Sequence, residues 1–201
     1  MIGLFKKKPE TLPLRYYGDP VLRKKAKVVV AVTPEICKFA EKMIDTMYAS
    51  HGVGLAAPQV GKSIRLIVLD TVPGKGELPP EATPGEILLS PRMPLALVNP
   101  EVIGVSKERD VASEGCLSVP KIFADVARPT RVVLRATLLN GEKVEVECGG
   151  LLGRCIQHEI DHLDGVLFPD RVEKDELAEI AGEVELLAKQ TKAAIKKAKT
   201  R

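Results

Sequence analysis

The sequence has no tryptophan, few other aromatic residues and no large excess of charge of either sign. Its 201 residues include three tyrosines and four phenylalanines, and 30 basic residues against 27 acidic ones leave a net charge of +3. A surface that stacks nucleic-acid bases needs clustered rings beside a basic groove, so these figures argue against a dedicated DNA- or RNA-binding protein. No run approaches the roughly 18 apolar residues of a membrane span, so we expect no membrane partner.

Cysteine is also sparse, and no two of the four cysteines form a C-x-x-C pair. This spacing weakens zinc-ribbon and thioredoxin-like interpretations. The apolar start, Met1–Phe5, is short and its lysines follow it, which is not the pattern of a signal peptide. We therefore expect a cytoplasmic protein with reduced thiols rather than a disulfide framework.

The chain is rich enough in apolar residues, at 45%, to form a core, and we predict a single domain over residues 1–201. Thr33 and Pro34 have the residue types of a helix N-cap and first helical position, and helical spacing continues to about Ser50. Gly52 is placed to end this helix. A strand is predicted over Arg65–Asp70.

Seven of the 15 prolines fall between Pro73 and Pro100, which predicts a long surface loop at about 71–96. Such a loop is either functional or a tolerated insertion. After a predicted strand at Leu97–Ser106, two β-prone segments flank Asn140-Gly141, the dipeptide typical of a hairpin turn. These segments are Arg131–Leu139 and Glu142–Cys148.

Two more helices are predicted in the last third of the chain. The first runs from Leu151 to about Asp164 and stops at Gly165, and the second, with a basic end, covers about 175–199. Together these elements predict an α+β fold, in which mostly antiparallel strands pack around a buried helix and a further helix ends the chain.

The segment His158-Glu159-Ile160-Asp161-His162 carries the clearest chemistry. Positions i and i+4 of a helix lie on one face, so both imidazoles can reach one metal ion. Glu159 is offset from the pair and can stand beside a water as a proton shuttle without being a ligand.

A catalytic metal site needs a third protein ligand, and the residues leave its identity open. Phe168 occupies the position at which a metzincin-type pattern has its third histidine, so that pattern fails. A metalloprotease could use Glu183 or Glu185, downstream on the last helix. The other candidate is Cys116, in the turn-like segment Glu114–Ser118.

A third distinctive segment, His51–Gly61, is rich in glycine and alanine, which let a backbone come close to a ligand. It lacks the Lys-Ser/Thr of a phosphate-binding loop, so nucleotide binding is not expected. Gln59 offers an amide that could donate to a developing oxyanion.

Taken together, these segments resemble the three signature motifs of the peptide deformylases, metal-dependent hydrolases that remove the formyl group from the N-terminus of new bacterial proteins. The matching residues are Gly52–Gln59, Glu114–Ser118 and His158–Gly165, in the order and approximate spacing of the family. Gly18–Leu22 is also similar, so the resemblance covers about residues 14–170.

The resemblance implies that Cys116, His158 and His162 hold the metal and leave a fourth position for water. Glu159 would take the proton from this water and deliver it to the leaving amine while the resulting hydroxide attacks the formyl carbonyl. It also implies that the amide of Gln59 and the backbone N–H of Leu117 stabilise the oxyanion.

The resemblance further implies that N-formylmethionyl peptides are the substrates and that ferrous iron is the metal, with zinc, nickel or cobalt as substitutes. Residues around Gly54 would pair with an extended peptide, and an apolar pocket would take the methionine side chain. The substrate-binding residues expected in this way are Gly52, Val53, Gly54, Gly115, Leu151 and Cys155, with Ile156 as a further pocket wall.

Two departures and one extension accompany the resemblance. Phe123 lies near the position of an arginine that helps many bacterial members to grip the substrate, and the proline-rich 71–96 segment is longer than usual. The lysine-rich end of the last helix is similar to the segment that some members use at the ribosome, which makes the ribosome a candidate partner. The metalloprotease with a downstream glutamate stays as the alternative function.

Overall fold

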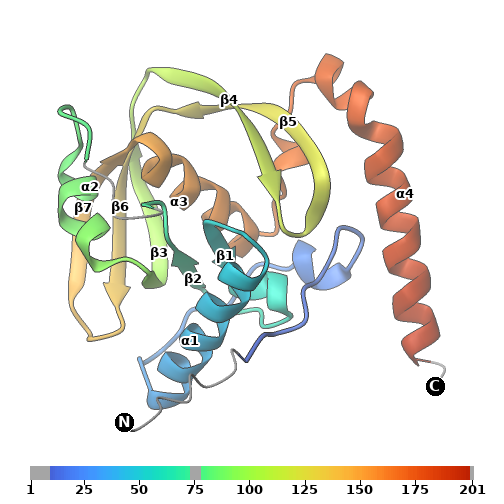
Figure 1. Ribbon diagram of the computed structural model, residues 1–201, viewed down its shortest axis with the longest axis horizontal. Coiled ribbons are helices and arrows are strands. Elements are labelled where there is room, and N and C mark those ends of the chain that lie inside the picture. Colours follow the sequence, from blue (N-terminus) through green and yellow to red (C-terminus); the bar gives the residue numbers. More distant parts are fainter. Residues whose placement is uncertain (1–9, 73–77, 200–201) are drawn as a thin grey trace, which may run out of the picture.

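The computed structural model describes residues 10–72 and 78–199. Within these ranges the chain forms a five-stranded antiparallel sheet, a separate two-stranded hairpin and four α-helices (Figure 1). In chain order the elements are α1 (Pro34–Ala49), β1 (Gly54–Ala56), β2 (Leu66–Leu69), α2 (Pro84–Leu89), β3 (Leu95–Val105), β4 (Arg109–Cys116), β5 (Val119–Pro129), β6 (Arg131–Leu138), β7 (Lys143–Gly149), α3 (Gly150–Leu163) and α4 (Lys174–Lys199).

The five-stranded sheet, ordered β1-β2-β3-β6-β7, has a hydrophobic core on each face. Strand β2 shows the division, because successive side chains of a strand point to opposite faces. Leu66 and Val68 pack with residues of α1, whereas Ile67 and Leu69 pack with residues of α3. Burying each such side chain contributes roughly 1.5–3 kcal/mol, so both helices are held firmly on the sheet.

Helix α3 is covered on a second side by the β4–β5 hairpin. Its residues Leu152, Ile156 and Leu163 join the core of the sheet. Arg154 and His158, on other positions of the helix, contact β4 and β5. Helix α4 packs against β5 of this hairpin. As a result α3 lies in the middle of the molecule and α4 at its edge (Figure 1).

The predicted α+β class with a buried central helix is confirmed, and so are most of the predicted elements. The Asn140-Gly141 turn joins β6 to β7, with Gly141 at φ +87° as such a turn requires. The β4–β5 hairpin is an addition that the sequence patterns did not indicate. Among the described residues, no helix is long and apolar enough to cross a membrane. That residues 1–201 form one domain stays a prediction.

The end of α1 differs in one detail from the prediction. The helix begins at Pro34 with Thr33 as its N-cap, as expected, but ends at Ala49. The left-handed residue that turns the chain is His51, at φ +58°, and not Gly52. Gly52 instead lets the chain pass close to Leu117, because a Cβ there would lie 2.8 Å from the end of the Leu117 side chain, which would have to move.

The prediction of an irregular loop at 71–96 is wrong in its second half. Residues 73–77 lie outside the described ranges, but 84–89 form helix α2. Pro84 does not break this helix because it occupies the first turn, where its missing N–H leaves no hydrogen bond unmade. Thr83 caps α2 and also accepts a hydrogen bond from the backbone N–H of Gly149 (3.0 Å). The segment therefore supplies a partner for the backbone N–H of Gly149, the N-cap residue of α3, which has no side chain of its own to cap the helix.

We expect Thr83→Ala to lower the free energy of unfolding by about 1–2 kcal/mol, because Gly149 and Glu86 would both lose a buried hydroxyl partner. Thr83→Ser keeps this hydroxyl and should retain most of the stability. Urea denaturation followed by circular dichroism measures both. Equal stability of the alanine variant and the wild type would contradict this account of the segment.

Candidate metal centre

Helix α3 brings His158 and His162 to one face, one turn apart, with ring centroids separated by 5.1 Å. His162 is 1% exposed. Burial lowers the pKa of its imidazole well below the ordinary value. This ring is therefore neutral and offers a lone pair of the kind that binds a metal ion.

Cys116 lies at the end of β4 rather than in a turn, where a register shift between Gly115 and Cys116 interrupts the pairing with β5. Its Sγ is 3.2 Å from Nε2 of His162. The sulfur and one nitrogen of each histidine all lie within 4.8 Å of one another. A tetrahedral ion with bonds of about 2.0–2.3 Å holds its ligand atoms about 3.5 Å apart, so this set of one sulfur and two nitrogens fits one divalent ion.

The two glutamates considered as alternative ligands are both exposed on α4. Glu185 pairs instead with Lys189 on the same helix (3.0 Å). Neither belongs to the group of residues that could share an ion among the described ranges. The metalloprotease alternative is therefore not favoured.

Glu159 is buried beside the ligand cluster, and its Oε2 has no hydrogen-bond partner. Burial raises the pKa of this carboxyl group to about 7, despite the opposing charges of His158 and Arg128. Strand β1 comes so close that a Cβ on Gly54 would lie 2.5 Å from Oε1 of Glu159. The carboxyl group thus lies at the cavity with an oxygen available to a substrate or a water.

Sequence reasoning missed a group of buried charges behind His158. Glu114 accepts from Nδ1 of His158 (2.9 Å) and is itself held by Arg128 and Arg154. Burial alone would raise the pKa of Glu114, but the hydrogen bonds from Arg128 and His158 outweigh it and hold the pKa well below its usual range. The sequence does contain a sign of this burial, because successive side chains of a strand point to opposite faces. In β5, Arg128 follows Ala124 and Val126 at every second position and so lies with them on the buried face.

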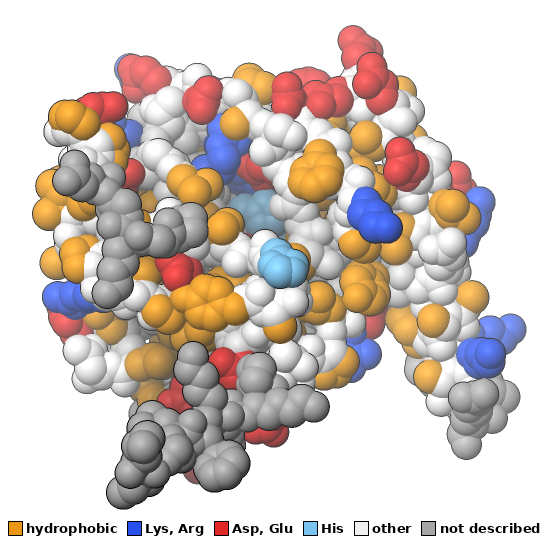
Figure 2. All heavy atoms as spheres, viewed as in Figure 1, with side chains coloured by type: hydrophobic (Ala, Val, Ile, Leu, Met, Phe, Trp, Pro, Cys, Tyr) orange, Lys and Arg blue, Asp and Glu red, His pale blue; other side chains and the backbone are white. Residues whose placement is uncertain are grey.

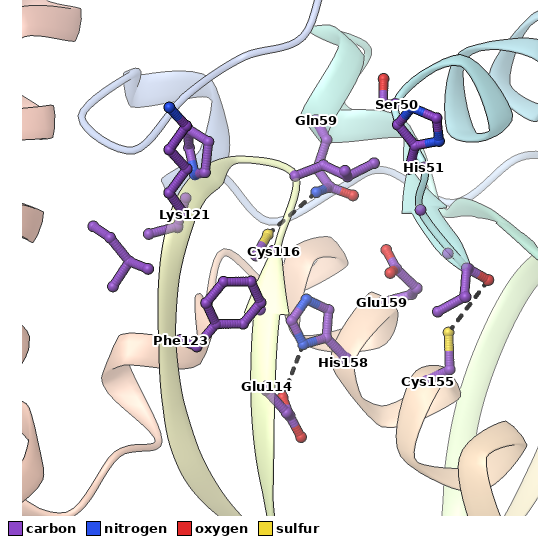
Figure 3. Close-up of a pocket in the computed structure, with 18 of the residues that line it drawn as sticks. Ser50, His51, Gln59, Glu114, Cys116, Lys121, Phe123, Cys155, His158 and Glu159 are labelled. Carbon is purple, nitrogen blue, oxygen red and sulfur yellow. Dashed lines mark hydrogen bonds and ion pairs between the residues drawn. The ribbon is translucent and has the colours of Figure 1, made fainter.

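Gln59 is 1% exposed, in a 3-10 turn after β1. Its Oε1 accepts from the N–H of Ala56 (2.7 Å), which orients its Nε2 toward Ser118 Oγ (3.2 Å) and Cys116 Sγ (3.4 Å). An amide donor is thereby fixed beside the ligand cluster. Figure 3 shows Cys116 between Gln59, to which a dashed line joins it, and His158, with Glu159 beside them.

These residues surround a cavity of about 560 Å³. Figure 2 shows a hollow on this face, with histidine atoms inside it and hydrophobic side chains around it. The expected substrate-binding residues all line the cavity: Gly52, Val53, Gly54, Gly115, Leu151 and Cys155. So do Leu117, His51 and Phe123, and Phe123 is 64% exposed. Ile156 does not, because its side chain points into the core of the sheet.

Comparison with known proteins agrees with this arrangement. Residues 11–178 match the family model of polypeptide deformylase. Peptide deformylase 2 of Gloeobacter violaceus is 49% identical over 162 residues, which is 81% of this chain and 79% of that protein. The crystal structure of a peptide deformylase from Synechococcus elongatus, in complex with actinonin, superposes with a TM-score of 0.75 at 41% identity over 88% of this chain and 89% of that one. The enzyme from Thermotoga maritima gives a TM-score of 0.70 at 43% identity, over 81% of this chain and 98% of that one.

We expect the purified protein to hold about one equivalent of divalent metal and Cys116→Ser to hold much less, because a neutral hydroxyl is a poorer ligand than a thiolate. Elemental analysis by mass spectrometry after dialysis measures the metal. Cys37→Ser is the matched control, since Cys37 lies on α1 outside the cavity. Equal metal contents of the two variants would exclude Cys116 as a ligand.

Proposed function

The chain belongs to the polypeptide deformylase family and is a metal-dependent hydrolase that removes formyl groups from peptides, and we propose that Cys116, His158 and His162 hold its metal. The observation that carries this proposal is the convergence of three ligand atoms beside a buried carboxylate that has an unpaired oxygen. When bound, a divalent ion acts as a Lewis acid, polarising the formyl carbonyl and making a water more acidic.

Glu159 is the proposed proton carrier. Its Oε2, which has no hydrogen-bond partner, accepts a proton from the attacking water. The water oxygen bonds to the formyl carbon, the C–N bond breaks, and Glu159 delivers the proton to the amine nitrogen. The products are formate and a free amino terminus. A pKa of about 7 suits both halves of this transfer near neutral pH.

Gln59 and Leu117 are the proposed donors to the oxyanion. The amide of Gln59 is already oriented by Ala56, so it needs no reorganisation when charge develops on the formyl oxygen. Leu117 directly follows Cys116 in the chain, and its backbone N–H is the second proposed donor. Nε2 of Gln59 donates to Oγ of Ser118 and Sγ of Cys116, which lie on either side of Leu117 in the chain.

The substrate peptide is proposed to lie along β1. This strand begins the sheet order and pairs only with β2 among the described residues, so its other edge is available for an extended peptide. Gly54 brings the backbone of β1 close to Glu159, so the space between them is narrow and suits formyl, the smallest acyl group, better than a larger one. The apolar walls at Leu151 and Cys155 are proposed to receive the methionine side chain.

We also propose ferrous iron as the ion, the cytoplasm as the location and the ribosome as a partner. A thiolate with two imidazoles suits iron as well as zinc, nickel or cobalt. The described cysteines are all free, as a reducing compartment favours. Exposed lysines at the end of α4, among them Lys189, Lys192 and Lys197, supply the basic surface that ribosomal RNA would require.

Glu159→Gln should lower kcat for formate release from formyl-Met-Ala by about 10²–10⁴-fold, because the amide cannot carry the proton. Its metal content should match the wild type, since Glu159 is not a proposed ligand. Formate is measured with a coupled dehydrogenase assay on anaerobically purified protein. Glu183→Gln, a change at an exposed site on α4, is the control. If the metal-loaded wild type releases no formate, the proposed activity is wrong. If Glu159→Gln releases formate as fast as the wild type, the role of Glu159 as proton carrier is wrong.

Gly54→Ala should reduce kcat/KM by about 10²-fold, since the new methyl group would displace Glu159 by around 1 Å. Gly104→Ala is the matched control, because a Cβ there would meet nothing closer than 3.4 Å. The same formate assay compares the two. Undiminished activity of Gly54→Ala would show that the close approach of β1 to Glu159 is not required.

A further inference from the structure

A row of three buried charges connects the elements that carry the proposed metal ligands. It consists of Glu114 on β4, Arg128 on β5 and Asp161 on α3, with side chains 5%, 5% and 11% exposed. Arg128 donates from Nε and Nη2 to the two oxygens of Glu114 (2.6 and 2.9 Å) and from Nη1 to Oδ2 of Asp161 (2.9 Å).

One end of this row fixes His158. Nδ1 of His158 lies 2.9 Å from Oε2 of Glu114, which as a carboxylate can only accept, so Nδ1 carries a proton and Nε2 is the ring nitrogen directed away from Glu114. Arg154 donates to Oε1 of Glu114 alone (2.8 Å), a contact that leaves the carboxylate able to rotate about that oxygen. The two-pronged contact from Arg128 holds both oxygens of Glu114 and with them the plane in which His158 donates.

The other end of the row returns to the same helix. Asp161 lies between His158 and His162 on α3, and Arg171 closes the row from outside with a second contact to its carboxylate (2.6 Å). Glu114 and Cys116 lie on the same strand. Arg128 therefore ties the strand that carries the sulfur to the helix that carries both imidazoles.

Stability alone does not account for this row. A buried ion network is commonly no better than well-packed apolar residues of similar volume, because its charges lose their hydration. What apolar side chains cannot supply is a fixed orientation for a histidine proton and a fixed spacing between two elements.

We propose that Arg128 and Asp161 are positioning residues of the metal centre, which act through Glu114 on the orientation of His158 and on its spacing from Cys116. The inference rests on the proposed assignment of His158 and Cys116 as metal ligands. It assigns neither Arg128 nor Asp161 a contact with substrate or metal.

The test is the affinity for Co²⁺, measured by competition with a chromogenic chelator, together with the visible absorption spectrum of the Co²⁺-loaded protein. Arg128→Lys keeps the charge and loses the two-pronged contact, and Asp161→Asn keeps the shape and loses the charge. We expect each to weaken Co²⁺ binding by about 10–100-fold and to change the spectrum. Arg65→Lys is the matched control and should bind Co²⁺ as the wild type does. Arg65 pairs with Asp164, the C-cap residue of α3 (2.7 Å), and donates to the backbone oxygen of Pro100 (3.1 Å), so it holds the same end of the helix without joining the row.

Urea unfolding of the metal-free proteins separates positioning from stability. The inference would be overturned if folded Arg128→Lys and Asp161→Asn had the Co²⁺ affinity and spectrum of the wild type. It would also be overturned if Arg65→Lys lost as much affinity as these two variants. If Arg128→Lys does not fold, Asp161→Asn decides alone, because it is isosteric. If Co²⁺ binding by the wild type does not depend on Cys116, the proposed metal site itself is wrong. If the wild type binds Co²⁺ through Cys116 but the two variants bind it equally well, only the positioning inference is wrong.

Discussion

The contact between Glu114 and His158 is the interaction on which the site depends, because through it a largely buried carboxylate orients one imidazole of the ligand cluster (2.9 Å). No residue of α3 between Leu152 and Leu163 is exposed. A helix buried in this way must place most of its polar groups against partners, since an unpaired buried polar group costs about 1–3 kcal/mol. The atoms of α3 left without a partner, Oε2 of Glu159 and Nδ1 of His162, both belong to the site. The sheet takes the apolar side of α3, and the β4–β5 hairpin supplies the charges for the other. The order of layers in the fold follows from this division.

Much of the fold could be predicted because it is encoded locally. The histidine spacing, the Thr33 cap and the Asn140-Gly141 turn are each contained in a few consecutive residues, and local backbone preferences determine them. Proline shows the limit of such reasoning. Pro34 and Pro84 both begin helices, but the second lies in a proline-rich segment whose composition favoured a loop. Composition describes an average over many residues, whereas a helix start depends on the position of one.

The site was predictable only in part for a related reason. His158 and His162 lie one turn apart, so a single helix suffices to bring them together. Cys116 is far from them in sequence, and nothing in its local surroundings distinguishes a ligand from a packing thiol. Its place depends on the register of β4 against β5 and on the packing of the hairpin on α3. Arg128 is harder still, because its role depends on contacts with two other elements at once.

The apolar cores and the buried charges contribute differently to this protein. The cores on the two faces of the sheet supply most of the free energy of folding, and they depend on the amount of surface buried more than on exact contacts. The charges around Glu114 add little net stability, since burying them costs about what their pairing returns. They do restrict geometry, because a hydrogen bond weakens steeply when its angle departs from the optimum. A core of the same volume without these charges could still fold, but it would leave the imidazole of His158 free to rotate, and a site that must hold one ion in a fixed geometry cannot tolerate that freedom.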